Sequence, residues 1–345
     1  MIPAPIFSGT FLIVLGISFL ATVSVLIWAV ALAVFPRARR AFGAHWIRWS
    51  VLLGVLCWAG SLFVALAIGC LQIELESRRT EAAKHPVLEK PARLLGIDMP
   101  SATKLTLYTA GNMASLTAAE FPQAVSVYGI PAVALTVGAE FDDEAPWDNQ
   151  HPTMLKALAL ALAITGPRSL DGWTCDTGGE PMRIVLRNDT RIKALWRCRL
   201  AEGNRTGDSV IPAGSTLMRS TTTYGDGLHD NDYWRVDVAE GSVFELDRLS
   251  LRHPTLNLDR QHRVLAFDST TLARAASVGD ITYPAGTEVS SGRRGLREKY
   301  PGAWVFTPAP GQPAVSKTDG TIADDTSVVQ APSGTVYARL RNRAH

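Results

Sequence analysis

The stretch LAEGNRTGDSVIPAGSTL, residues 200–217, has a close counterpart in LARAASVGDITYPAGTEV, residues 272–289. The two align without a gap at an offset of 72 (284 − 212), and both contain a Pro-Ala-Gly triplet, Pro212 to Gly214 and Pro284 to Gly286. Degenerate versions of the end of this motif occur at residues 96–107 and 327–338. An ungapped match of this length indicates an internal repeat.

The Pro-Ala-Gly triplet predicts a tight turn between two strands, because proline fixes φ and glycine accepts a positive φ. A single strand-turn-strand unit cannot bury its own apolar face, so the copies must stack or pair. Short apolar runs such as AVSVYGI and YWRVDV, set between turn residues, predict further strands. Residues 92–345 are therefore expected to form a mainly β domain of repeats, either a solenoid or stacked hairpins.

The segment TMLKALALALAIT, residues 153–165, supports two interpretations. Alanine and leucine are strong helix formers, and the preceding His-Pro pair resembles a helix start. Leu158, Leu160 and Leu162, however, alternate with the period of a strand. We predict a helix here and keep the strand as the alternative.

The first 73 residues contain two long apolar runs. Residues 8–35 and 49–73 carry no charge, and about 20 apolar residues suffice to cross a bilayer as a helix. The sequence thus predicts a two-helix transmembrane anchor over residues 1–73. Ser61, Ala65 and Gly69 recur on one face of the second run, which predicts close packing there against the first helix, with oligomerisation through the same face as the alternative.

The loop between the two runs, residues 36–48, is rich in arginine. Its basic residues are Arg37, Arg39, Arg40 and Arg48. The positive-inside rule places this loop in the cytoplasm and both chain ends outside. With the charged residues 74–91 as a stalk or linker, we expect a multi-pass protein of the bacterial inner membrane, with residues 92–345 in the periplasm.

Four cysteines divide between the two regions. Cys57 and Cys70 lie in the second apolar run, whereas Cys175 and Cys198 lie in the β region. An even pair in an oxidising compartment predicts a disulfide.

Two acidic stretches and one serine motif are the candidate sites for chemistry. Asp226, Asp230 and Asp232 form a candidate Ca²⁺ loop, although a solvated hairpin loop explains them better. The acidic residues 140–148 are also expected to be a solvated loop rather than a pair of catalytic carboxylates. Residues 101–104, SATK, match a serine-hydrolase pattern, but Ser101 occupies the turn position of Ala213 in the repeat, so we predict a turn residue.

The function expected from these observations is that of a non-enzymatic binding module. It would need no cofactor and would contact the lipid bilayer and a protein partner in the envelope, with an immunity-type role against an envelope-acting toxin as the most specific form. The alternatives are an envelope scaffold that binds lipid or glycan and a hydrolase that uses the acidic loops. The basic residues 291–300 do not predict nucleic-acid binding, since they would lie outside the cell.

Overall fold

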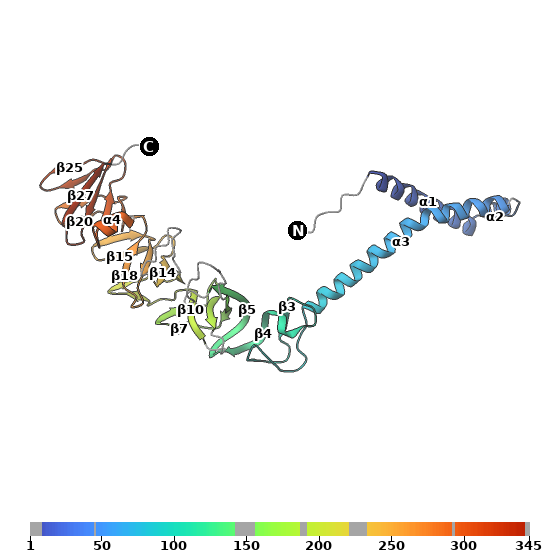
Figure 1. Ribbon diagram of the computed structural model, residues 1–345, viewed down its shortest axis with the longest axis horizontal. Helices are drawn as coiled ribbons and strands as arrows, with labels where there is room; N and C mark the ends of the chain where they lie inside the picture. Colours follow the sequence, from blue (N-terminus) through green and yellow to red (C-terminus); the bar gives the residue numbers. More distant parts are fainter. Residues whose placement is uncertain are drawn as a thin grey trace, which may run out of the picture. The chain divides into compact units, whose positions relative to one another are not determined.

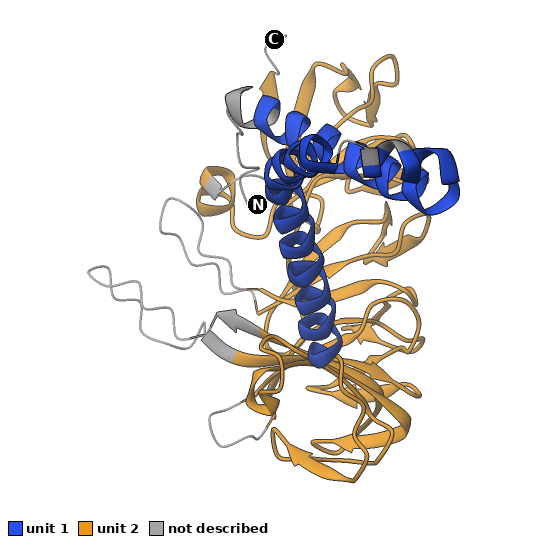
Figure 2. Ribbon diagram, turned by 90° about the vertical axis from the view of Figure 1, so that its right-hand side faces the viewer, with its two compact units in different colours: residues 1–84 blue, residues 85–345 orange. Residues whose placement is uncertain are grey.

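The computed structural model describes residues 9–44, 46–141, 156–186, 192–220, 233–291 and 294–341. The chain divides into two compact units, Met1–Lys84 and His85–His345 (Figure 2). The first unit is helical and the second is built mainly from antiparallel strands (Figure 1).

The helical unit contains α1 (Gly9–Val34), α2 (Pro36–Ala44) and α3 (Trp46–Lys84). By length and composition, α1 and α3 are each able to cross a membrane, while α2 carries most of the arginine-rich loop. The helix α3 continues through the charged residues that follow its apolar run, where Arg78 pairs with Glu74 at 2.7 Å. Much of the predicted stalk is therefore the end of α3, and the second unit begins at His85.

The helices α1 and α3 pack where Gly60 meets Thr22. A Cβ at Gly60 would lie 2.8 Å from Thr22 Oγ1. The Thr22 hydroxyl donates to the Gly60 carbonyl (3.2 Å), and the Phe63 amide donates to Ser18 Oγ (2.8 Å). Small residues allow this close approach.

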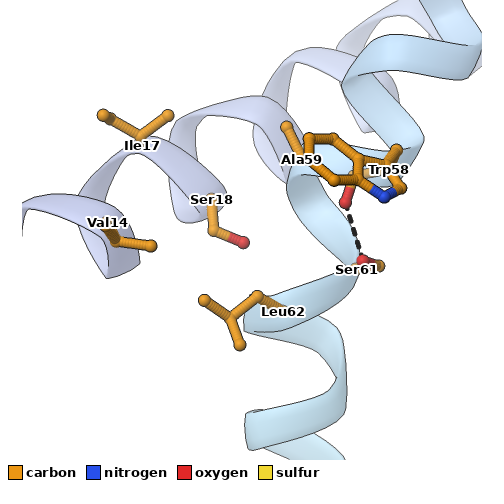
Figure 3. Close-up of a pocket in the computed structure, with 7 residues that line it drawn as sticks. All are labelled: Val14, Ile17, Ser18, Trp58, Ala59, Ser61 and Leu62. Atoms are coloured by element: carbon orange, nitrogen blue, oxygen red, sulfur yellow. Dashed lines mark hydrogen bonds between the residues drawn. The ribbon is translucent and has the colours of Figure 1, made fainter. Parts of the chain in front are cut away.

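The contact therefore runs through Gly60 and not through the predicted face of Ser61, Ala65 and Gly69. Ser61 and Ala65 are exposed, and a Cβ at Gly69 would have no neighbour within 4 Å. Figure 3 shows the open groove beside the contact, with Ser18 on one side and Leu62 on the other. The physical reason is that the hydroxyls of Thr22 and Ser18 bond to the backbone of α3 at Gly60 and Phe63, which turns another side of α3 toward α1.

The β unit is dominated by a ten-stranded antiparallel sheet. In spatial order its strands are β18 (Val264–Phe267), β17 (Thr255–Leu258), β14 (Trp234–Asp237), β13 (Thr216–Arg219), β10 (Ile192–Arg199), β9 (Met182–Leu186), β6 (Lys156–Ile164), β5 (Ile130–Phe141), β4 (Leu116–Val127) and β3 (Lys104–Leu107).

Two smaller sheets follow in the chain. One has the order β19 (Thr270–Thr271), β22 (Glu288–Ser290), β23 (Trp304–Thr307), β26 (Thr326–Gln330) and β27 (Val336–Arg341). The other has the order β20 (Ala276–Val278), β21 (Ile281–Tyr283), β24 (Ala314–Ser316) and β25 (Gly320–Ile322). The short helices are η1 (Met113–Ser115) and α4 (Arg294–Lys299).

Short hairpins are inserted between neighbouring strands of the large sheet. They are β7 (Arg168–Leu170) with β8 (Trp173–Cys175), β11 (Arg205–Thr206) with β12 (Ser209–Val210), and β15 (Val243–Leu246) with β16 (Leu249–Arg252); β1 (Ala92–Leu94) pairs with β2 (Ile97–Met99) before β3. The main strands thus pair in chain order, while every second connection from β6 to β17 carries a hairpin.

The prediction of a helix over residues 153–165 is wrong. Residues 156–164 form β6, which pairs with β5 on one side and β9 on the other. Leu160 and Leu162 are fully buried. The helix propensity of alanine and leucine favours a helix by only roughly a few tenths of a kcal/mol per residue. Strand pairing on both edges and burial in the sheet outweigh this preference.

The Pro-Ala-Gly turns make the same backbone hydrogen bonds as one another. Gly214 and Gly286 both have φ of 85°. Each donates its amide to a leucine carbonyl fourteen positions earlier, a bond that Ala102 (φ 64°) also makes. The donors and acceptors are Gly214 N and Leu200 O (2.8 Å), Gly286 N and Leu272 O (2.8 Å), and Ala102 N and Leu88 O (2.7 Å).

The fourth version of the motif, residues 327–338, is different. It forms the turn between β26 and β27, where Gly334 donates to the nearby Ala331 carbonyl at 2.9 Å. Here the motif joins two main strands directly, whereas the other turns follow a hairpin.

Gly214→Val and Gly286→Val are each expected to lower the free energy of unfolding by roughly 1–3 kcal/mol, because a β-branched residue is strained at positive φ. At Gly214 the new Cβ would also lie 3.0 Å from Arg199 Nη2. Denaturant titration of the purified protein measures the effect. Gly166→Val is the control, because it has open space and no positive φ; equal losses at all three positions would contradict the prediction.

Candidate binding site around Tyr233

The candidate metal and acid-base residues fall mostly outside the described part of the chain. Asp226, Asp230 and Asp232 lie in residues 221–232, and the acidic stretch lies almost wholly in residues 142–155. Among the residues that the structure does describe, no group of three or more His, Cys, Asp or Glu side chains could hold a metal ion.

The SATK motif lies in a turn. Ser101 is exposed just after β2, and Thr103 Oγ1 donates to the Pro100 carbonyl at 2.8 Å. Lys104 begins β3 and pairs with Glu120 at 3.6 Å. No helix starts at this serine, so the serine-hydrolase pattern lacks the helix that it requires.

The structure contains a disulfide between Cys175 and Cys198, with a Cα–Cα distance of 5.8 Å. Both residues are buried. Cys175 ends β8, and Cys198 lies in β10. The bond thus joins an inserted hairpin to the large sheet, next to a β-bridge between Cys175 and Leu200.

A cluster of cationic and aromatic side chains surrounds Tyr233, just before β14. The guanidinium carbons of Arg219 and Arg260 lie 4.4 and 4.6 Å from the centre of its ring. Tyr233 is half-buried, Arg260 is exposed and Arg219 is buried. Such contacts between a cation and an aromatic ring are favourable and hold the guanidinium groups in place.

The Tyr233 ring packs against buried aromatic rings. Tyr233 contacts Trp234 edge to face, with ring centres 5.2 Å apart, and Trp234 contacts Trp173 at 6.1 Å. Both tryptophans are almost completely buried. The backbone of Tyr233 is fixed as well, since its amide donates to the Leu258 carbonyl at 2.7 Å. We refer to Tyr233, Arg219 and Arg260 as the Tyr233 cluster.

Arg260 comes from a turn that Asp259 holds closed. One oxygen of the Asp259 carboxylate accepts the amides of Gln261 (2.9 Å) and Arg263 (2.8 Å), and the other accepts Arg263 Nε (2.8 Å). Burial alone would raise the pKa of Asp259, but its bonds to Arg263 and Gln261 hold the pKa below its usual value. The carboxylate stays charged at neutral pH, so the turn keeps its shape.

The Tyr233 cluster combines an aromatic ring with one exposed and one buried guanidinium group. Within the described residues, Arg260 makes no salt bridge, and its guanidinium group lies over the Tyr233 ring. An exposed guanidinium that is held in position can pair with a carboxylate of a binding partner. Tyrosine, tryptophan and arginine are also the residue types that contribute most to protein–protein binding.

Sequence reasoning missed this cluster. Its members come from three places in the chain, the end of β13, the start of β14 and the turn before β18, and only strand pairing brings them together. Isolated arginines and aromatic residues form no local motif. The one available signal was the pair of aromatic residues at Tyr233 and Trp234.

Comparison with known proteins gives no match: no family model, no curated protein and no solved structure matches this chain.

Proposed function

We propose that this protein is a non-enzymatic binding module, held at a membrane by α1 and α3, whose β unit binds a protein partner. The observation that carries the proposal is the Tyr233 cluster, in which two guanidinium groups contact one tyrosine ring that also packs against the buried Trp234. Because Arg260 is exposed, the partner's surface should present a carboxylate at this point. The immunity-type role stays a prediction from the sequence.

We also infer that the β unit lies outside the cytoplasm, in the periplasm of a bacterium. Two observations support this location. Disulfides such as Cys175–Cys198 persist in oxidising compartments. The arginine-rich segment around α2 favours the cytoplasmic side for the connection between α1 and α3.

We further infer that the β unit is a stack of hairpin repeats. The shared hydrogen bonds of the three turns support this arrangement, and so does the spacing of the hairpins. Gly207 and Gly279 begin equivalent hairpin turns 72 residues apart (279 − 207), and the hairpin of β15 and β16 lies between them. One sequence period would thus contain two structural repeats.

Tyr233→Ala and Arg260→Glu are expected to abolish capture of the partner, because one removes the ring and the other reverses the charge. Crosslinking in intact cells, followed by purification in detergent and mass spectrometry, measures which proteins are held in stoichiometric amount. Tyr108→Ala, at a tyrosine that is 80% exposed and far from the cluster in sequence, is the matched control.

Two outcomes would contradict the proposal. If the same protein is captured equally by all variants, the Tyr233 cluster is not the docking surface. If lipid or glycan is recovered in place of a protein, the scaffold alternative is favoured.

The location is tested by reporters fused after His345. A reporter that is active only outside the cytoplasm should give signal, and one that is active only inside should give none, because the arginines around α2 fix the orientation. The reverse result would overturn the periplasmic location and leave the disulfide without an oxidising compartment.

A further inference from the structure

The segment around α2, which connects α1 to α3 (Figure 1), carries positive charge that the helical unit does not balance. Arg37, Arg40 and Arg48 are exposed. No aspartate or glutamate occurs in residues 1–73, and the next acidic residue, Glu74, follows Arg48 by 26 positions of the same helix (74 − 48). That separation is roughly 39 Å along a helix, several times the roughly 8 Å over which salt screens a surface charge. These arginines therefore have no acidic partner within the helical unit.

One of the three arginines of α2 has a structural role. Arg39 Nε donates to the Leu32 carbonyl at 2.7 Å, and Arg39 Nη2 donates to the Ala33 carbonyl. Both carbonyls belong to the last turn of α1, whose carbonyl groups lack partners within the helix. A cation at this end of a helix also interacts favourably with the helix dipole. Arg39 thus caps α1, which leaves Arg37 and Arg40 for contact with a ligand.

Aromatic side chains set the depth of this segment in the membrane. Phe42 of α2 contacts Trp28 of α1 edge to face, with ring centres 6.0 Å apart, and Trp28 contacts Trp49 of α3 at 4.5 Å. Trp46, at the start of α3, is 62% exposed. Tryptophan is enriched at the level of the lipid headgroups. With α1 and α3 across the bilayer, as the proposed function holds, α2 lies at that level.

Arg37 and Arg40 lie on one side of α2. Residues three apart on a helix are neighbours, with about 5–6 Å between their Cβ atoms. Phe42, which is held against Trp28, lies on the opposite side, because successive residues are rotated by about 100° around a helix. Two guanidinium groups this close, on the exposed side of α2, can bind one phosphate group through several charge-assisted hydrogen bonds.

We propose that Arg37 and Arg40 bind the phosphate of an anionic phospholipid headgroup at the membrane surface. The inference rests on the membrane anchoring of the proposed function. The charge of the site selects an anionic lipid over a zwitterionic one, because a choline or ethanolamine group would bring a second positive charge next to the arginines. The lipid site belongs to the helical unit, whereas the Tyr233 cluster belongs to the β unit and takes a protein.

The test uses the full-length protein, purified from membranes in detergent, with phosphatidylglycerol and phosphatidylcholine added in equal amounts. Native mass spectrometry measures how much of each lipid stays bound. The wild type should retain several times more phosphatidylglycerol than phosphatidylcholine. Arg37→Gln combined with Arg40→Gln should remove this preference, because it removes both phosphate-binding groups and leaves Arg39 bonded to α1.

Arg78→Gln combined with Arg79→Gln is the matched control. It removes the same charge from the other end of α3, where Arg78 pairs with Glu74 at 2.7 Å, and should keep the preference. Arg37→Lys combined with Arg40→Lys should keep part of it, since lysine retains the charge without the forked donor geometry of arginine. A preference lost equally in the lysine and glutamine variants would overturn the role of charge at this site.

The remaining outcomes separate the lipid site from the proposed function. Equal retention of the two lipids by the wild type overturns the site, and so does an unchanged preference after the glutamine substitutions at Arg37 and Arg40. Displacement of phosphatidylglycerol by excess inorganic phosphate overturns the choice of a lipid. A lipid preference in a protein that captures no partner supports the site and contradicts only the proposed binding function. Recovery of the wild type from the soluble fraction of cells overturns the anchor and the lipid site together.

Discussion

Removing the disulfide by the double substitution Cys175→Ala and Cys198→Ala is expected to lower the free energy of unfolding of the β unit by about 3 kcal/mol. The bond closes a loop with a sequence separation of 23 residues, so most of its effect comes from restricting the unfolded chain. Its position adds to the effect, because it fastens the hairpin of β7 and β8 to β10 of the large sheet.

Pulse proteolysis in increasing urea, with and without reductant, measures this loss in the full-length protein. Reductant should destabilise the wild type and leave the double variant unchanged. Cys57→Ser with Cys70→Ser is the matched control, since these two cysteines of α3 are free and exposed and their loss should not alter the β unit. If reductant leaves the wild-type midpoint unchanged, the disulfide does not stabilise the fold.

The local chemistry of the sequence was enough to predict part of this fold. The two apolar helices, the mainly β second unit and the disulfide are present in the structure. The Pro-Ala-Gly triplets that begin at Pro212 and Pro284 each end in a glycine of positive φ, as the sequence predicts for a tight turn. These features depend on a few neighbouring residues or on composition, which a single sequence displays directly.

The remaining features depend on contacts between distant residues. Residues 156–164 became a strand because β5 and β9 pair with both of its edges, and neither neighbour is visible in the segment itself. The contact between α1 and α3 lies at Gly60 because of hydroxyls at Ser18 and Thr22, which the spacing of small residues in α3 does not reveal. The Tyr233 cluster depends likewise on the order of the strands.

Gly279→Ala is expected to lower the free energy of unfolding by about 3–5 kcal/mol, from steric overlap, strain at positive φ and lost hydrogen bonds together. Gly279, with φ of 57°, lies in the turn of β20 and β21 and touches Gly334 in the turn of β26 and β27. An added Cβ would lie 2.8 Å from both the Cα and the carbonyl oxygen of Gly334. Both obstacles are backbone atoms, so a side-chain rotation cannot relieve the overlap.

The same contact orders a buried amide. Gln330 Nε2 donates to the carbonyls of Val278 (2.8 Å) and Gly334 (2.9 Å), and its Oε1 accepts the Tyr283 hydroxyl (2.8 Å). Gln330 and Tyr283 are fully buried, and burial raises the pKa of the Tyr283 hydroxyl. Separating the two turns would leave polar groups without partners in the core, which costs more than the hydrogen bonds contribute when formed.

Gly311→Ala is the matched control for Gly279→Ala. Gly311 also has positive φ, 73°, but a Cβ there would meet no atom within 4 Å, so about 1 kcal/mol of backbone strain is the whole expected cost. Urea titration of both variants measures the difference. Equal destabilisation would mean that the two turns do not touch and that positive φ alone sets the loss of unfolding free energy. A much larger loss for Gly279→Ala would show that the turn of β20 and β21 packs backbone against backbone with the turn of β26 and β27.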